Sequence, residues 1–177
     1  NEPLLEIAES QALDRINRRN TFDWVKESFT NLKEKLGLKN LERIEAFDIS
    51  HNQGSKVTAS CVCFSEDGPD KKNYRSMKLS LNKNDDYVAL AEAVRRRLKN
   101  LEGNKKSLPD LLVIDGGKGQ LNSVFNELEK NGFKEINLIS ISKGPLRNEK
   151  YDEIHLKNSP YKICLLYTSD AADDLYR

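Results

Sequence analysis

The stretch PDLLVIDGGKGQL, residues 109–121, marks where a buried strand ends and a helix begins. Its apolar run, residues 111–114, is typical of a strand that is buried on both faces, and the run ends on Asp115. Three glycines and Lys118 then predict a loop, after which a helical pattern begins. A carboxylate between a buried strand and a glycine loop is costly unless a positive or hydrogen-bonding group receives it. Two interpretations follow: the loop and Lys118 cradle a phosphate, or Asp115 holds a metal ion.

The composition indicates one domain with a solvated surface. A chain of 177 residues can form one domain with an appendage, and 37% of hydrophobic residues allow a core. The net charge of +1 leaves any nucleic-acid affinity to the distribution of charge. No apolar run is long enough to cross a membrane, and no signal peptide is visible. The three cysteines form no Cys-x-x-Cys pair, so a zinc site is not expected, and the expected location is the reducing cytoplasm.

The first part of the chain predicts a helix followed by an antiparallel meander. Residues 4–36 carry apolar side chains at helical spacing, and Gly37 suits the end of a helix. This segment is interpreted as an amphipathic helix packed on the domain, or as a connector to an upstream domain. Residues 43–49 and 74–79 alternate between apolar and polar positions, and residues 57–64 contain an apolar stretch. With turn residues between them, these segments predict three antiparallel strands.

The rest of the chain alternates helices with strands. Asn84 is expected to cap a helix that carries Asp86 in its first turn and an apolar stripe as far as Leu101. The other expected elements are strands at 111–114, 136–141 and 154–156 and a helix from 118 to about 132. Three strands, helix, strand, helix and strand predict an α/β fold with a mixed sheet and helices on its faces. That order is also the order of the ribonuclease-H-like fold, although a fold alone names no function.

The phosphate interpretation of the glycine loop has little support in the spacing. A phosphate loop of the Walker type needs a Ser or Thr directly after its lysine, and Gly119 follows Lys118 here. The Gly-x-Gly-x-x-Gly pattern of dinucleotide-binding folds is also absent from the sequence. A nucleotide-binding loop is therefore the weaker of the two interpretations.

The metal interpretation rests on two strand-end carboxylates. Asp48 ends the first predicted strand of the sheet and Asp115 ends the fourth. If those strands are neighbours, the two carboxylates meet at one edge and repel each other unless a divalent cation lies between them. Such a site is typical of two-metal phosphodiester hydrolysis. The alternative is two separate aspartates that accept hydrogen bonds from backbone amides.

Further residues are candidates for contact with a metal ion or a phosphate. Asp86 could add a carboxylate, although helix capping is the stronger explanation of an acidic residue there. Lys118, Lys143 and the run Arg95-Arg96-Arg97 could contact phosphates. The arginines are expected mostly on the outer side of their helix, where a solvated surface explains them equally well.

Six short motifs occur along the chain in a fixed order: FDISH (47–51), ASCV (59–62), YR (74–75), DDY (85–87), IDGGKGQL (114–121) and SKG (142–144). Over residues 32–156 this series closely resembles the C-terminal endonuclease half of the UvrC family, the incising subunit of bacterial nucleotide excision repair. The two longest motifs are specific. The preceding helix also resembles the segment that links the nuclease to the family's UvrB-binding region.

The resemblance implies a ribonuclease-H-like nuclease that cuts damaged double-stranded DNA 5′ to the lesion with Mg²⁺ or Mn²⁺. The family's catalytic aspartates fall on Asp48 and Asp115, which would also bind the metal, and a further acidic residue falls on Asp86. The implied partner is UvrB, with UvrA upstream in the pathway. The residues expected to contact DNA are Lys118, Gln120, Lys143 and Arg97.

Part of the family's pattern is absent from this sequence. The remaining catalytic residue of the family is a histidine in an Arg-Asp-Glu-x-His stretch downstream of Asp115. His155, expected as a surface or strand residue, has neither the neighbours nor the position, so the role is not transferred to it. The tandem helix-hairpin-helix module and the N-terminal nuclease domain are also missing. The chain is therefore expected to be a truncated nuclease domain that folds marginally and is inactive alone.

The expected organisation is a helical linker from the upstream UvrB-binding region (1–38), an incomplete ribonuclease-H-like domain (39–163) and a non-native tail (164–177). The tail, CLLYTSDAADDLYR, resembles a translated sequencing-adapter read-through. Two alternatives to a repair endonuclease stay open. One is a non-catalytic nucleic-acid-binding or scaffold domain of the same fold, and the other is a nucleotide-binding protein built on the glycine loop.

Overall fold

The computed structural model of the chain describes residues 23–51, 57–79, 86–143, 151–156 and 162–166. One sheet contains every described strand, in the order β3-β2-β1-β5-β6-β7-β8, with β4 also paired to β2. The strands are β1 (Arg43–His51), β2 (Val57–Ser65), β3 (Gly68–Pro69), β4 (Arg75–Leu79), β5 (Leu111–Asp115), β6 (Asn137–Lys143), β7 (Tyr151–Leu156) and β8 (Lys162–Leu166). A 3-10 turn (Lys71–Asn73), α2 (Asp86–Gly103), α3 (Lys118–Lys130) and a helix over residues 23–36 complete the described elements.

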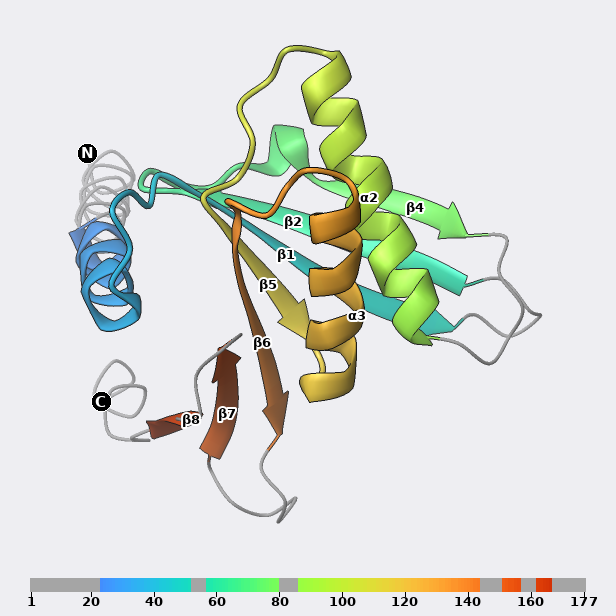
Figure 1. The fold of residues 1–177 in the computed structure, drawn as a ribbon. Helices are drawn as coiled ribbons and strands as arrows, with labels where there is room; N and C mark the ends of the chain where they lie inside the picture. The colour runs from blue at the N-terminus through green and yellow to red at the C-terminus, as the bar shows by residue number, and fades with distance from the viewer. Residues whose placement is uncertain (1–22, 52–56, 80–85, 144–150, 157–161, 167–177) are drawn as a thin grey trace, which may run out of the picture.

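The pairing of the strands confirms the predicted α/β class. β1, β2 and β4 form the antiparallel meander, whereas β5 pairs parallel with β1 on one side and with β6 on the other. Parallel neighbours need a crossover, and α2 and α3 provide the two crossovers (Figure 1). β7 and β8 extend the sheet antiparallel beyond β6. β8 was not predicted, and it crosses the expected boundary at 163/164 between the domain and a non-native tail.

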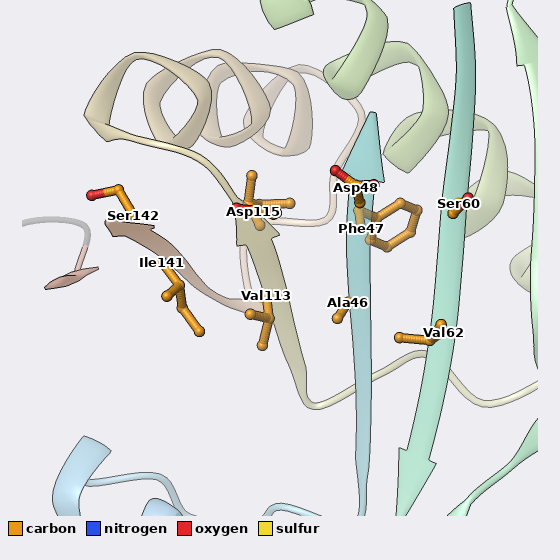
Figure 2. Close-up of a pocket in the computed structure, with 10 residues that line it drawn as sticks. Ala46, Phe47, Asp48, Ser60, Val62, Val113, Asp115, Ile141 and Ser142 are labelled. Atoms are coloured by element: carbon orange, nitrogen blue, oxygen red, sulfur yellow. The ribbon is translucent and has the colours of Figure 1, made fainter. Parts of the chain in front are cut away.

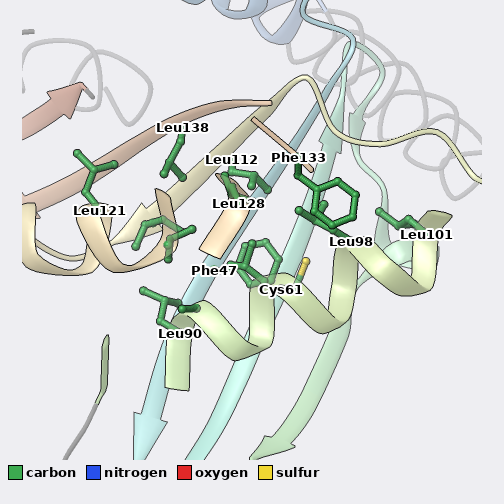
Figure 3. Packing of buried hydrophobic residues seen from close by; sticks show 14 residues of the cluster. Phe47, Cys61, Leu90, Leu98, Leu101, Leu112, Leu121, Leu128, Phe133 and Leu138 are labelled. Carbon is green, nitrogen blue, oxygen red and sulfur yellow. The ribbon is translucent and has the colours of Figure 1, made fainter. Parts of the chain in front are cut away.

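The two faces of the sheet are covered differently. α2 and α3 lie on one face, where Phe47 and Leu112 from the sheet pack with Leu98 and Val124 from the helices (Figure 3). The 23–36 helix packs on the other face, where Phe29 contacts a cluster that includes Ile139. Alternation along β1 and β5 explains this division, because successive side chains of a strand point to opposite faces.

The 23–36 helix ends at Gly37, as its sequence predicts. Gly37 has a φ of 63°, a left-handed conformation that glycine adopts without steric cost. The N–H of Gly37 donates to Glu34 O at 3.1 Å, and the N–H of Leu38 donates to Lys33 O at 3.0 Å, which satisfies the last carbonyls of the helix. The earlier part of the predicted helix, residues 4–22, and the predicted cap Asn84 lie outside the described residues. None of the helices in the described ranges is long and apolar enough to cross a membrane.

The expectation that Arg97 lies on the outer side of its helix is wrong. Arg97 is 3% exposed and faces β1, where its guanidinium forms two hydrogen bonds with Glu45, Nη2 to Oε1 at 2.7 Å and Nε to Oε2 at 3.0 Å. Arg43 Nη2 also donates to Glu45 Oε1, at 2.5 Å, and Cys61 Sγ lies 3.4 Å from Glu45 Oε2. A guanidinium held in this way inside the protein is not offered to DNA, so Arg97 is removed from the set of expected DNA contacts.

Candidate active site

Asp48 and Asp115 lie beside each other on the neighbouring parallel strands β1 and β5. Asp115 ends β5 as predicted, whereas β1 continues three residues past Asp48, to His51, so the prediction that Asp48 ends its strand is wrong. The register pairs Phe47 of β1 with Ile114 of β5, so each aspartate is the next residue along its strand. Neighbouring strands are about 4.8 Å apart. Both aspartates are exposed, and Figure 2 shows them on the neighbouring strands β1 and β5. The condition for a shared carboxylate edge, that the first and fourth predicted strands are neighbours, is therefore met.

The two carboxylates border a pocket of about 330 Å³ on the sheet face opposite α2 and α3. Ala46 and Val113 also line the pocket; each lies two residues before an aspartate on the same strand and points to the same face of the sheet (Figure 2). Val62 and Ile141 extend this apolar wall onto β2 and β6. Ser60 adds a hydroxyl, because the register places it opposite Asp48 on β2. The pocket thus combines an apolar wall with oxygen atoms at one end.

The glycine loop is shaped by Gln120. The side-chain Oε1 of Gln120 accepts a hydrogen bond from Gly117 N at 2.9 Å, and the N–H of Gly116 donates to Ile141 O at 2.8 Å. A Cβ on Gly116 would lie 2.6 Å from Gln120 Cδ, so glycine is needed where the side chain folds back. A phosphate-binding loop uses free backbone amides as donors. The amides of Gly116 and Gly117 already donate within the protein, so the geometry disfavours a phosphate-binding loop and favours a loop that positions Asp115.

The residues expected to contact DNA are only partly placed by the structure. Lys118 is exposed at the first residue of α3, three residues after Asp115. Gln120 is half-buried, and its oxygen is engaged in the loop. The side chain of Lys143 lies outside the described part, although its backbone ends β6. Contact between these residues and DNA stays a prediction.

Asp86 is not brought into the pocket. It is exposed at the first residue of α2, and it is not among the residues that line the pocket of Asp48 and Asp115. Within the described ranges, no group of three or more His, Cys, Asp or Glu side chains is placed to hold a metal ion. A third carboxylate in the site therefore stays a prediction.

His155 lies in β7 and is 5% exposed, so it is a strand residue rather than a surface residue. Its Nε2 lies 2.7 Å from Ser142 Oγ and 3.8 Å from Glu153 Oε2. A Ser-His-acid relay needs the serine and the acid on different ring nitrogens, and here both face Nε2. This arrangement therefore gives no reason to assign a nucleophile to Ser142.

Two adjacent carboxylates fit a hard divalent cation. Like charges on adjacent strands repel each other, and a cation between them removes the repulsion. Carboxylate, hydroxyl and water oxygens are the ligands that Mg²⁺ prefers, and Mg²⁺ is usually held by only one or two protein carboxylates. Asp48 and Asp115 are thus the residues that could hold such an ion. The sequence alone did not single out Ser60, because its place opposite Asp48 depends on the register of β1 and β2.

Comparison with known proteins connects this geometry to a family. A family model described as the UvrC RNase H endonuclease domain matches residues 33–175. UvrABC system protein C of Legionella pneumophila (strain Lens) is 41% identical over 149 residues, which are 83% of this chain and 24% of the relative. The same protein of Nitrosococcus oceani is 43% identical over 145 residues, 81% of this chain and 23% of the relative. The chain spans about a quarter of the length of these curated relatives.

Matches among solved structures are more distant. Ciona intestinalis endonuclease V, solved with an inosine-containing DNA, is 16% identical with a TM-score of 0.46, over 62% of this chain and 49% of that chain. Human endonuclease V is 19% identical with a TM-score of 0.46, over 61% and 48%. The family match runs through residue 175, so it does not separate residues 164–177 from the domain, and a non-native tail stays a prediction.

Proposed function

Because this chain belongs to the family of the UvrC RNase H endonuclease domain, we propose that it is the domain that makes the 5′ incision in damaged DNA, with Mg²⁺ or Mn²⁺ as cofactor. Its sheet has the predicted ribonuclease-H-like order. The observation that carries the proposal is the pairing of Asp48 with Asp115 on adjacent parallel strands. No other described acidic residues line that pocket.

In this proposal each part of the edge has a distinct task. Asp48 and Asp115 hold the divalent ion, which supplies an activated water and stabilises the leaving oxygen when bound. The glycine loop, closed by Gln120, fixes the position at which Asp115 leaves its strand. Lys118, exposed at the start of α3, contacts a phosphate of the cut strand. The apolar wall of the pocket reduces the number of waters that compete at the carboxylates.

The partners proposed for the chain follow from the name of its relatives. The relatives are named as protein C of the UvrABC system. We propose that this chain acts with UvrB on damaged double-stranded DNA, after UvrA has acted, in the cytoplasm. These partners are proposed from full-length relatives, and the chain spans about a quarter of the length of those relatives.

Binding of Mn²⁺ tests the metal site directly. Asp48→Asn and Asp115→Asn each remove one charged ligand but keep the shape of the side chain. We expect each to weaken Mn²⁺ binding at least 10-fold in electron paramagnetic resonance titrations, because a single carboxylate remains. Asp67→Asn, in the exposed turn between β2 and β3, is the matched control and should bind Mn²⁺ like the parent chain. Asp86→Asn shows whether α2 adds a ligand.

A nicking assay on lesion-bearing duplex with UvrA and UvrB tests the reaction itself. Nicking 5′ to the lesion that needs Mg²⁺ or Mn²⁺ and that is lost in Asp115→Ala supports the proposal. Nicking that survives Asp115→Ala would overturn it. DNA binding without any dependence on a divalent ion, together with unchanged Mn²⁺ binding in both asparagine variants, would instead support a non-catalytic domain of the same fold.

A further inference from the structure

Tyr87 and Gly119 form a contact that the proposed metal site does not explain. Tyr87 is the second residue of α2 and Gly119 is the second residue of α3. A Cβ on Gly119 would lie 2.9 Å from Tyr87 Cε1, 3.0 Å from Cζ and 3.1 Å from the phenol oxygen. The phenol end of Tyr87 therefore rests on the backbone of α3, in space that any residue other than glycine would fill.

This contact places the ring against the first turn of α3. A side chain on Gly119 would displace the ring, so the absence of one is what allows the contact. Ser123 Oγ also donates to the backbone carbonyl of Tyr87 at 3.0 Å, which ties the first turn of α2 to α3. Support from α3 limits the positions open to the ring, which lowers the conformational entropy that it loses on binding a partner.

The ring nevertheless remains open to solvent. Tyr87 is 49% exposed and its neighbour Val88 is 46% exposed, which places both among the few exposed large hydrophobic residues of the described ranges. Lys118, directly before Gly119, is exposed as well. Figure 1 shows that α2 begins near the end of β1 and α3 begins near the end of β5. Asp115 ends β5 and Asp48 lies three residues before the end of β1, so both helix starts lie at the end of the sheet that carries the two aspartates, although on the opposite face.

An exposed aromatic ring beside a cation, at the edge that carries the carboxylates, matches one chemistry. Single-stranded nucleic acid is bound by aromatic side chains that stack on bases and by cations that contact the backbone. We propose that Tyr87 is a stacking platform for a nucleobase of the DNA strand that enters the metal site, with Lys118 on the adjacent phosphate. This inference rests on the proposed function, because it assumes that DNA is the substrate.

Photo-crosslinking and binding measurements on the 177-residue chain test the proposal. The probe is a single-stranded oligonucleotide that carries 5-iodo-2′-deoxyuridine, with Ca²⁺ in place of Mg²⁺ to prevent cutting. We expect a mass-mapped adduct on Tyr87, and Tyr87→Ser should weaken binding by roughly 5- to 150-fold in fluorescence anisotropy. Tyr87→Phe should bind within about twofold of the parent, since the ring and not the hydroxyl stacks. Trp24→Ser, at an exposed aromatic residue of the 23–36 helix, is the matched control.

The outcomes separate this inference from the proposed function. An unchanged affinity in Tyr87→Ser, or the absence of a Tyr87 adduct, overturns the stacking platform. Equal losses in Tyr87→Ser and Trp24→Ser overturn it as well. If Tyr87→Ser also loses Mn²⁺ binding while circular dichroism shows a folded chain, Tyr87 positions the metal site and does not stack a base. If Asp48→Asn and Asp115→Asn leave Mn²⁺ binding intact, the proposed function fails whatever Tyr87 does.

Discussion

Replacing Arg97 by methionine should destabilise the fold by about 3 kcal/mol at pH 7. Removing one partner of a buried ion pair costs about 3–5 kcal/mol, because the other charge is left uncompensated inside the protein. The lower end applies here, since Arg43 still donates to Glu45 Oε1 at 2.5 Å. Glu45 is fully buried and Arg97 is 3% exposed, so solvent screens their interaction very little. Methionine fills the space of the arginine stem without its charge.

The pH dependence of this loss has a defined sign. Burial raises the pKa of Glu45, but the hydrogen bonds from Arg97 and Arg43 lower it by more, so the pKa lies below its ordinary value of 4.5. The stabilisation from the pair is therefore complete above pH 4.5 and is lost as the pH falls through the lowered value. Arg97→Met removes one of the two arginines that lower the pKa of Glu45, so burial raises this pKa in the variant and Glu45 becomes neutral at a higher pH than in the parent. A neutral Glu45 needs no partner, and the parent loses the stabilisation from its ion pair as the pH falls. The difference in free energy of unfolding between parent and variant should therefore become smaller below pH 4.5.

Urea denaturation followed by circular dichroism measures both effects. With a slope of about 2 kcal/mol per molar urea, a loss of 3 kcal/mol lowers the midpoint by roughly 1.5 M. The double variant Glu45→Gln/Arg97→Met removes the uncompensated charge of Glu45 but leaves Arg43 without a carboxylate, so it should recover part of that loss. A loss below about 1 kcal/mol in Arg97→Met, or a double variant no more stable than the single one, would refute the reasoning.

Two further predictions concern the loop and the thiols. Gln120→Ala should cost the hydrogen bond to Gly117, about 1 kcal/mol, as measured by urea denaturation. Gly116→Ala should cost more, because its Cβ displaces Gln120 and because Gly116 has a φ of 158°, which residues with a side chain rarely adopt; the double variant should cost no more than Gly116→Ala alone. Additive losses would contradict this account. Cys61 and Cys63 are buried and burial raises the pKa of both thiols, so peptide mapping should show that iodoacetamide labels them far more slowly in the native chain than in urea. Equal rates would contradict their burial.

Most of the fold could be predicted from local patterns. The apolar run before Asp115 and the alternation of residues 43–49 and 57–64 predicted β5, β1 and β2, because periodicity reports directly on burial. The ribonuclease-H-like α/β class follows from the order of these elements and is confirmed by the strand pairing and the family match. β8 was missed, because residues 164–177 were interpreted as a non-native tail and left out of the fold prediction, whereas β8 runs to Leu166 and pairs with β7.

The sequence predicted the candidate site only on the condition that the strands of Asp48 and Asp115 are neighbours. The sequence predicted that Asp48 and Asp115 end their strands, which is right for Asp115 and wrong for Asp48, because β1 continues to His51. It could not pair the two strands, since register depends on contacts between residues far apart in the chain. The structure meets that condition, and the same register adds Ser60. The position of the two carboxylates does not itself show metal binding, which the Mn²⁺ titrations described above test.

The wrong prediction that Arg97 lies on the outer side of its helix shows how a charged residue of the core can be recognised in a sequence. Arg97 lies seven residues after Leu90 and four before Leu101, so it falls on the apolar stripe of α2 and not on its outer side. A single charge on such a stripe is costly, which favours an outward placement. Glu45, however, lies two residues before Phe47 and so shares the inward face of β1. Opposite charges on two faces that must pack together predict a buried pair.

That pair connects the core to the candidate site through β1. Glu45 and Asp48 are three residues apart, so they point to opposite faces of the strand. A slip of one residue in the pairing of β1 would turn Glu45 away from Arg97 and move Asp48 toward the helices. The bidentate contact of Glu45 with Arg97, joined by Arg43, opposes such a slip, because each buried charge is satisfied in one register only. From inside the core, Arg97 thus stabilises the register of β1 that places Asp48 beside Asp115.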